Sequence, residues 1–191
     1  MIMKSFTKNI VINLCVCFFS FPLLAIENET VEDDKITNEF VENIIMKEKA
    51  GVRYYKNGKY QIAFDKLTYS AKRGLKLSQY LLGIMYLKGQ HVEQSLFYGM
   101  AWLGVAKESK AKEWVTLFDE IYAKATPEQQ QAIETNTAKF IEKYGMKAQA
   151  ITCNKRARLG ERKIIRECTK NGKVFDIPRI DSNQSIFKNQ Y

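Results

Sequence analysis

The stretch LLGIMYLKGQHVEQSLFYGMAWLGVA, residues 81–106, decides the fold because its features recur in AGVRYYKNGKYQIAFDKLTYSAKRG, residues 50–74. Gly51 aligns with Gly83, and a tyrosine follows each glycine by three residues. Ala63 lies twelve residues after the first glycine and Gly99 sixteen after the second, so the second segment has four additional residues in its turn. Each segment is typical of two amphipathic helices joined by a turn, and the recurrence predicts a helical repeat array.

Residues 81–106 resemble a Sel-one-like repeat. The positions that carry the resemblance are Leu82, Gly83, Tyr86, Gly89, Val92, Gly99, Trp102 and Ala106. Residues 50–74 resemble the related tetratricopeptide repeat through Gly51, Tyr54, Ala63 and Leu67. The resemblance implies a protein-binding scaffold, in which the first helix of each repeat lines a concave groove.

The resemblance also implies which side chains face that groove. They are Glu48, Val52, Tyr55 and Lys56 in the first repeat and Tyr80, Ile84, Leu87 and Lys88 in the second. Tyrosine and leucine at helical spacing are equally typical of a helix core, so packing is the competing interpretation of these positions. Phe64, Leu67, Tyr86 and Trp102 are expected to pack between helices.

A third, degenerate unit follows, with Phe118 where the pattern has a small residue. It is interpreted as the capping pair that a short array needs at its end. Its second helix is predicted to begin after Thr126, with Pro127 at the first helical position and Gln129 completing a capping box. Gly145 is expected to end that helix.

The N-terminus predicts export. Lys4 and Lys8 precede the uncharged run IVINLCVCFFSFPLLA, residues 10–25, and an acidic stretch follows directly. This order is typical of a secretory signal peptide, and 16 apolar residues fall short of the ~20 that span a bilayer as a helix. We therefore expect a bacterial protein that is periplasmic or secreted, and not an integral membrane protein after cleavage. Cys15 and Cys17 would leave with the signal peptide.

The remaining cysteines, Cys153 and Cys168, bracket fourteen residues and would reach an oxidising compartment. A two-residue turn at Gly160-Glu161 predicts a hairpin in which paired residue numbers sum to 321. The same register pairs Cys153 with Cys168, so a disulfide-closed hairpin is predicted. A hairpin of this kind is similar to a tail that recurs in small exported bacterial proteins.

Six basic residues lie between the two cysteines: Lys155, Arg156, Arg158, Arg162, Lys163 and Arg166. They leave a second interpretation open, in which the hairpin binds an anionic envelope polymer such as lipopolysaccharide or cell wall. Nucleic acid is a less favoured ligand, because the register divides the charges between both faces and the hairpin has no aromatic residue for stacking. The C-terminal residues 151–191 hold ten bases and four acids, whereas residues 26–49 hold eight acids and three bases.

Together these features predict a mainly α fold: a short α-solenoid of tetratricopeptide-like helical hairpins followed by a small disulfide-closed β-hairpin. The expected segments are a signal peptide (1–25), an acidic leader (26–38), the helical repeats (39–145), the basic hairpin (146–180), with a short strand near residues 174–177, and a flexible tail (181–191). The single histidine, His91, has only Glu93 nearby in the sequence, and no nucleophile motif or phosphate-binding loop is present. The expected function is therefore a non-catalytic, cofactor-free scaffold that binds another protein or an envelope component.

Overall fold

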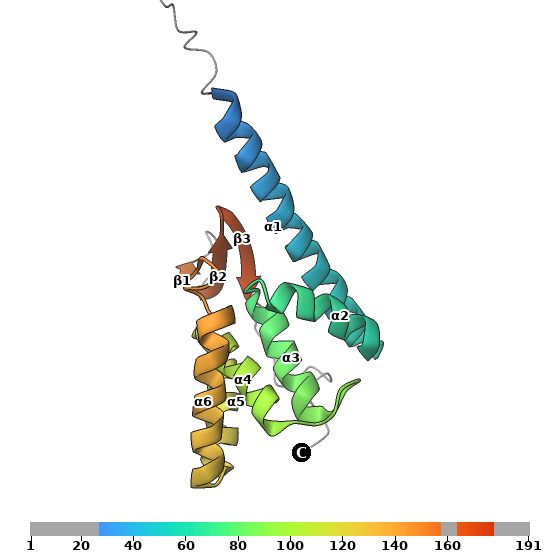
Figure 1. The fold of residues 1–191 in the computed structure, drawn as a ribbon, viewed down its shortest axis with the longest axis vertical. Helices are drawn as coiled ribbons and strands as arrows, with labels where there is room; N and C mark the ends of the chain where they lie inside the picture. Colours follow the sequence, from blue (N-terminus) through green and yellow to red (C-terminus); the bar gives the residue numbers. More distant parts are fainter. Residues whose placement is uncertain (1–26, 158–163, 178–191) are drawn as a thin grey trace, which may run out of the picture.

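The computed structural model describes residues 27–157 and 164–177, with the backbone alone given for residues 27–36 and 164. Six helices are followed by a small antiparallel sheet (Figure 1). The helices are α1 (Glu27–Lys56), α2 (Tyr60–Ala71), α3 (Lys76–Lys88), α4 (Leu96–Lys107), α5 (Lys112–Lys124) and α6 (Pro127–Tyr144). The strands are β1 (Ile151–Ala157), β2 (Ile164–Lys170) and β3 (Lys173–Ile177). The chain is thus mainly helical, as predicted.

Glycines let the first two helical hairpins close. A methyl group added at Gly51 of α1 would lie 2.8 Å from Cγ of Leu67 in α2. One added at Gly83 of α3 would lie 2.7 Å from Cγ of Leu103 in α4, and one at Gly99 would meet Leu87 equally closely. Real Cβ atoms do not approach so near, so the repeated small residues set the distance between paired helices.

The connections within the two hairpins differ as the sequence predicts. Residues 57–59 join α1 to α2, whereas residues 89–95 join α3 to α4, a difference of four residues. Both contain a glycine with positive φ, which is +70° at Gly58 and +64° at Gly89. Gly89 ends α3 in the left-handed conformation. The longer connection lets Ser95 cap α4, where its side chain accepts a hydrogen bond from the Tyr98 amide.

The third helical pair closes less tightly than the first two. Helix α6 packs mainly against α4, and α5 and α6 diverge near Phe118, which stands where the repeat pattern has a small residue. The predicted capping box is present at the start of α6, with Thr126 and Gln129 bonding to each other's backbone. Gly145 ends α6 as predicted, but in an extended rather than a left-handed conformation.

The sheet has the order β1-β2-β3 with both neighbouring pairs antiparallel. Cys153 pairs with Cys168, and Lys155 with Arg166, in the predicted register. The two cysteines form a disulfide with their Cα atoms 4.0 Å apart. The predicted turn at residues 160 and 161 lies outside the described residues. The expected short strand is β3, which pairs with β2 and extends the β1–β2 hairpin to a three-stranded sheet.

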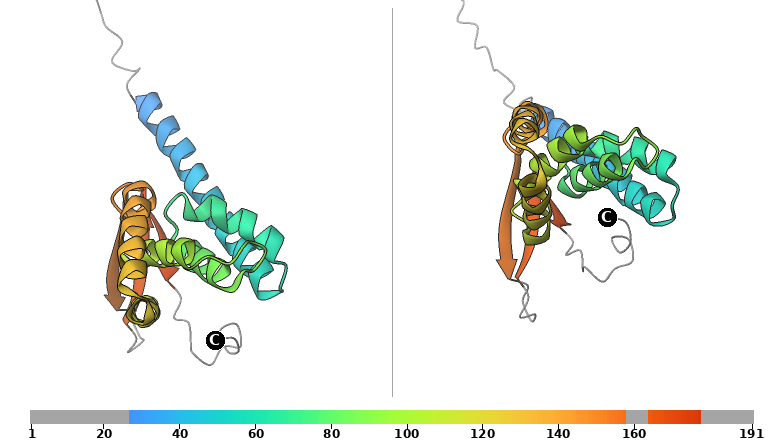
Figure 2. Two further views of the ribbon diagram at one scale, coloured as in Figure 1. Left: turned by 60° about the horizontal axis from the view of Figure 1, so that its bottom comes forward. Right: turned by 90° about the horizontal axis from the view of Figure 1, so that it is seen from below.

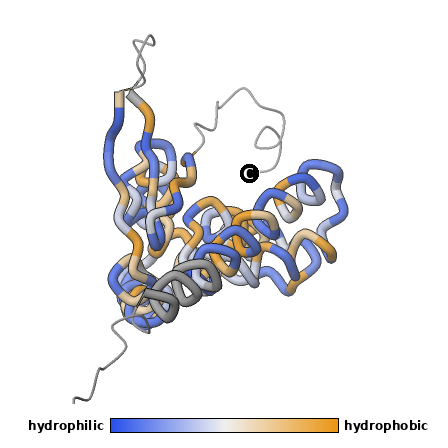
Figure 3. Tube along the Cα trace, turned by 90° about the horizontal axis from the view of Figure 1, so that it is seen from above, coloured by the Kyte–Doolittle hydropathy of each residue, from blue (hydrophilic) through white to orange (hydrophobic). Residues whose placement is uncertain are grey.

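One face of the sheet completes the hydrophobic core. Ile151, Cys168, Phe175 and Ile177 are buried on the face that the alternation of the strands turns toward the helices. Figure 2 shows the sheet packed against one end of the helical part, and Figure 3 shows hydrophobic segments where neighbouring helices meet. A single core therefore joins the helical repeats and the sheet.

The predicted acidic leader is in part a helix. Helix α1 begins at Glu27, and its N-terminal half extends beyond the rest of the molecule (Figure 1). No proline or glycine interrupts residues 26–50, and acidic residues near a helix N-terminus interact favourably with its dipole. The predicted signal peptide and tail lie outside the described residues. Among the helices described, none is long and apolar enough to cross a membrane.

Candidate functional site

A cleft of about 450 Å³ opens between α1, the first turn of α3 and β3. It is lined by Ile45, Glu48, Lys49, Val52, Leu77, Val174, Phe175 and Asp176. The first helices of the two repeats thus form two walls and the sheet forms the third. Two of the predicted groove residues of the first repeat, Glu48 and Val52, lie in it.

Strand β3 is joined to β2 by a tight turn and to α1 by an ion pair. The β2–β3 turn consists of Asn171 and Gly172 with φ of +47° and +74°, the pattern of a tight hairpin turn. Lys173 Nζ then reaches Glu42 Oε1 at 2.6 Å. Alternation along the strand buries Phe175 and leaves Val174 49% exposed. The strand therefore presents an apolar side chain at the mouth of the cleft.

Glu48, in the wall of the cleft, binds the first turn of α3. Its Oε2 accepts hydrogen bonds from the amide and the hydroxyl of Ser78, at 2.9 and 2.7 Å. Ser78 lies in the first turn of α3, whose amides have no partner within the helix, so Glu48 caps α3 from another helix. Burial raises the pKa of the Glu48 carboxyl, and the bonds from Ser78 oppose that rise.

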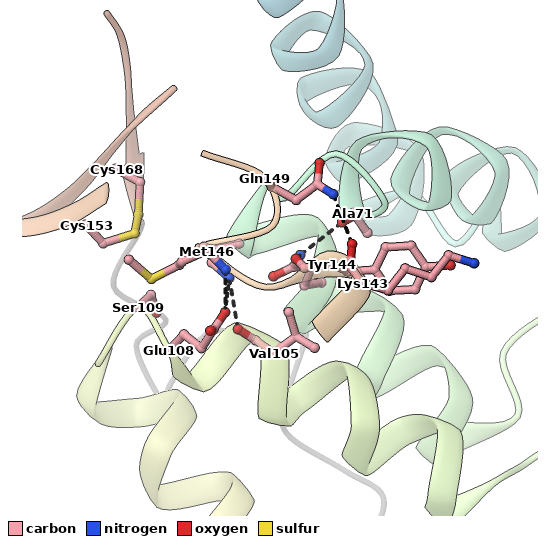
Figure 4. A network of polar contacts seen from close by, with 12 residues as sticks. Ala71, Val105, Glu108, Ser109, Lys143, Tyr144, Met146, Gln149, Cys153 and Cys168 are labelled. Atoms are coloured by element: carbon pink, nitrogen blue, oxygen red, sulfur yellow. Dashed lines mark hydrogen bonds and ion pairs between the residues drawn. A yellow bond between two sulfur atoms is a disulfide. The ribbon is translucent and has the colours of Figure 1, made fainter. Parts of the chain in front are cut away.

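Lys76, the first residue of α3, is fully buried and contacts three segments of the chain. Figure 4 shows Val105, Glu108 and Met146, which contribute to this network, close together. Its Nζ donates to the Val105 carbonyl at 3.0 Å and contacts Glu108 Oε2 at 2.9 Å. The same carboxylate oxygen accepts the amide of Met146, which follows α6, at 2.8 Å. Burial lowers the pKa of Lys76, and Glu108 opposes that change. This contact set fixes α3 relative to α4 and α6.

Further polar contacts join the helices to one another and β2 to two connecting segments. Gln79 Nε2 donates to the carbonyls of Ala71 and Tyr144, which joins α2 to the end of α6. Arg166 donates to the Ser109 carbonyl at 2.9 Å, and Lys170 donates to the Gln149 carbonyl at 2.5 Å. Strand β2, to which β3 is paired, is thus anchored on both sides of Cys168.

Most other predicted groove residues serve packing. Tyr55 is buried edge-on against Tyr60, and Tyr80 is buried in a stack on Trp114 with ring centroids 4.8 Å apart. Leu87 fills the space above Gly99, and Ile84 is 1% exposed. Tyr55, Tyr80 and Ile84 are almost fully buried, so the structure favours packing over partner contact at these three positions. Glu48 lies in the cleft with its carboxylate bonded to Ser78.

The two predicted groove lysines differ in exposure. Lys56 is exposed on α1, and Lys88 is half-buried at the end of α3. They remain candidates for partner contact, whereas Leu77 and Val174 enter the site although the sequence did not predict them. A leucine in a first helical turn and a valine in a short strand carry no local signal that they will meet.

The basic residues of the hairpin do not form one surface in the part of the sheet that the structure describes. Lys155 and Arg156 are exposed on opposite faces, and Arg156 pairs with Glu167 at 3.1 Å. Arg166 donates a hydrogen bond to the Ser109 carbonyl. Arg158, Arg162 and Lys163 lie outside the described residues. The three described basic residues of the hairpin therefore do not gather into one positive surface, and the polyanion site stays a prediction.

A second cleft, of about 420 Å³, lies where α5 and α6 diverge. Lys107 pairs there with Asp119 at 2.6 Å and lies over the ring of Phe118. Tyr122 donates to Glu134, which raises the pKa of its hydroxyl. The charged groups of this cleft already pair with one another. Within residues 27–157 and 164–177, no group of three or more His, Cys, Asp or Glu side chains is placed to hold a metal ion.

Comparisons with known proteins support the fold. No protein family matches the chain, and a search of curated proteins returns no match. Among solved structures, the chain is similar to a protective antigen of uropathogenic Escherichia coli that has an SLR (Sel-one-like repeat) fold. The two share 24% sequence identity with a TM-score of 0.50 over 66% of this chain. The match covers 29% of the antigen's length, so this chain corresponds to a minor part of it.

Proposed function

We propose that this protein is an exported, non-catalytic scaffold that binds another protein through the cleft between α1, α3 and β3. The observation that carries the proposal is the cleft itself, which has an apolar floor and walls supplied by the first helices of two repeats. The neighbouring SLR fold supports a helical-repeat scaffold. The sheet adds a third wall, and this makes the cleft more enclosed than two helices alone would.

Export is part of the proposal. It is supported by the predicted signal peptide and by the disulfide, which persists in oxidising compartments such as the bacterial periplasm. Cell fractionation tests it directly: the chain should appear in the periplasmic or secreted fraction, shortened at its N-terminus. Full-length chain in the cytoplasmic fraction would contradict export without bearing on the cleft.

The binding proposal is tested by photo-cross-linking in the cell. A photoreactive amino acid placed at Val174, which is exposed at the mouth of the cleft, should give discrete adducts with another protein. The same amino acid at Lys139, exposed on α6, is the matched control. Val52→Asn, which places an amide on the cleft floor, should abolish the Val174 adducts. Thermal unfolding of that variant verifies that it remains folded.

The proposal fails if Val174 gives no adduct, or if the adducts are unaffected by Val52→Asn in a protein that is still folded. Adducts from Lys139 alone would move the interaction to the other side of the molecule.

A further inference from the structure

Strand β3 is an edge of the sheet, and it lies next to α1 on the side away from β2 (Figure 1). The Cα atoms of Cys153 and Cys168 are 4.0 Å apart, a separation typical of an antiparallel pair that exchanges no backbone hydrogen bonds. Cys168 therefore directs its backbone groups toward β3, where its partner is Phe175. The alternation of the strand then directs the amide and the carbonyl of Val174 the opposite way, toward the free edge of β3.

The β2–β3 turn gives the same alternation. Asn171 and Gly172 form a two-residue turn, which is closed by the hydrogen-bonded pair of Lys170 and Lys173. Counting from that pair, Val174 again faces away from β2. Edge groups of this kind bond to the backbone of a further extended segment, which lies about 4.8 Å away, whereas a helix uses its own backbone groups internally. The edge therefore favours an extended occupant.

The cleft beside this edge has an apolar floor. Ile45, Val52 and Leu77 are each half-buried there, so they keep hydrocarbon in contact with water. Val174 adds an exposed side chain from β3. Apolar side chains placed on this floor would release that water. The occupant should therefore combine an extended backbone with apolar side chains.

The charges around the cleft do not select an acidic or a basic occupant. Lys49 and Asp176 line it with opposite signs. Glu48 is bonded to the first turn of α3, and Glu42, exposed on α1, pairs with Lys173. Recognition in this cleft therefore depends on backbone hydrogen bonds and apolar contact.

The chain that leaves β3 begins beside this cleft. The strand ends at Ile177, and residues 178–191 follow it, outside the described residues. They contain the apolar pair Ile186-Phe187, and residues 181–183 before it are Asp, Ser and Asn, which favour turns. Ten residues of extended chain span up to about 33 Å, whereas the wall that α1 contributes is only about 10 Å long. The length of this segment is therefore sufficient for the apolar pair to return to the cleft.

We propose that residues 184–188, QSIFK, occupy the cleft of their own chain as an extended segment beside β3. Successive side chains of such a segment point to opposite faces, so either Ile186 or Phe187 meets the floor in any register. The tether gives the segment an effective concentration on the order of mM, so it competes with any partner for the cleft. The inference rests on the function proposed above, because the partner of that same cleft must displace this segment.

A photoreactive amino acid in place of Phe187 tests the contact in the purified, oxidised chain from residue 26 onward. Mass analysis of peptides should find cross-links within one chain to the cleft segments of α1 or β3, with a yield that does not depend on protein concentration. Val52→Asn should abolish these cross-links. Val115→Asn, which changes a half-buried valine on α5 outside the cleft, is the matched control and should preserve them. Thermal unfolding verifies that both variants are folded.

A displacement measurement is independent of cross-linking. The probe is a synthetic peptide of residues 178–191. It should bind the full chain carrying Ile186→Asp/Phe187→Asp at least about tenfold more tightly than the parent, because the tethered competitor is removed. Ser182→Asp/Asn183→Asp makes the same change in net charge in the same segment, and this control should bind the peptide as weakly as the parent. Methylating the peptide amides one at a time should weaken binding at alternate residues, because only every second residue of a strand faces β3.

The inference is overturned if the photoreactive residue at position 187 gives no cross-link to the cleft, or if the cross-links persist in folded Val52→Asn. Equal affinity of the peptide for the parent and for Ile186→Asp/Phe187→Asp would also overturn it. Cross-links between two chains, with a yield that rises with concentration, would replace the chain's own segment by that of a second copy.

The two proposals fail separately. If Val174 captures another protein while position 187 gives no cross-link to the cleft, the scaffold function stands and the occupancy by residues 184–188 is refuted. If position 187 cross-links into the cleft but Val174 captures no protein even in Ile186→Asp/Phe187→Asp, the occupancy stands and the scaffold function is refuted.

Discussion

Replacing Glu108 by alanine should destabilise the protein more than replacing Lys76 by methionine, although both break the same ion pair. The Lys76 side chain is 0% exposed and that of Glu108 is 23% exposed. Without the carboxylate, the Lys76 ammonium stays buried with the Val105 carbonyl, and the Met146 amide loses its acceptor. Without the ammonium, Glu108 still reaches water and still accepts the Met146 amide.

The magnitudes follow from this asymmetry. Removing one partner of a buried pair costs about 3–5 kcal/mol, and the partial exposure of Glu108 places Glu108→Ala near 3 kcal/mol. Lys76→Met loses the bond to the Val105 carbonyl, about 1 kcal/mol, while the methionine fills most of the space of the lysine stem. For a chain of this length the melting temperature should fall by about 6–12 °C in the first variant and about 2–4 °C in the second.

Urea unfolding followed by the fluorescence of Trp102 and Trp114, both buried in the helical part, measures these losses. The double variant should lose less than the sum of the two single losses, because the uncompensated charge is gone. Burial holds the folded pKa of Lys76 below its ordinary 10.5, and loss of Glu108 lowers it further. The stability of Glu108→Ala should therefore recover as pH rises through that lowered pKa toward 10.5. Equal losses in the two single variants, or strict additivity, would refute this reasoning.

Reducing the disulfide, or replacing both cysteines in Cys153→Ser/Cys168→Ser, should lower the free energy of unfolding by about 3 kcal/mol. Urea titration with and without reductant measures this loss, and an unchanged unfolding midpoint would contradict it. Gly83→Ala should lower the free energy of unfolding by about 2 kcal/mol, although alanine has the better helix propensity, because the new methyl group meets Leu103. In the same titration, the double variant with Leu103→Ala should lose less stability than the sum of the two single losses. The raised folded pKa of Glu48 means that its stabilising contribution is complete below 4.5 and is lost as pH rises through the folded value. Glu48→Gln keeps an acceptor for Ser78 without this titration, so its stability relative to the parent should increase with pH above 4.5; a constant difference across pH would show that Glu48 does not titrate as inferred.

The repeat and the register were predictable because each rested on two signals that agree. Gly51 and Gly83 recur at equivalent positions, and the structure gives both the same reason, a close approach of the paired helix. The turn chemistry and the cysteine spacing each specify a register that pairs Cys153 with Cys168. Local patterns of this kind depend on neighbours along the chain, so they can be recognised without a structure.

The polar interior could not be predicted in this way. Lysine and glutamate are ordinarily exposed, and nothing near Lys76 or Glu48 in the sequence marks them as buried. Their partners lie 32 and 30 residues away, in elements whose relative placement depends on the whole fold. The exposure of the predicted groove residues also depends on elements far away in the sequence. The position of Tyr80 on its helix fits a concave face, but Trp114 from the third pair covers it.

The cleft was only half predictable. Its α1 wall contains Val52, which the repeat pattern placed in the groove, and Leu77 lies one turn before the predicted positions on α3. The third wall depends on where the sheet docks, and that docking involves the buried face of the sheet together with contacts of Lys173 and Arg166 to residues far away in the chain. No periodicity encodes a contact of this kind.

The first turn of α3 has a consequence for the order in which the molecule can be completed. Its residues bond backward to Glu48 and forward to Glu108 and Tyr144, so the partners emerge from the ribosome at widely separated times. A nascent chain that ends near residue 107 can already close both helical hairpins, yet Lys76 has no counter-ion and Gln79 has one acceptor fewer. Glu108, the next residue to be added, supplies the counter-ion of Lys76, whereas the second acceptor of Gln79 arrives only with Tyr144. The placement of α3 is therefore completed by residues 144 and 146, because Tyr144 accepts a bond from Gln79 and the Met146 amide donates to Glu108.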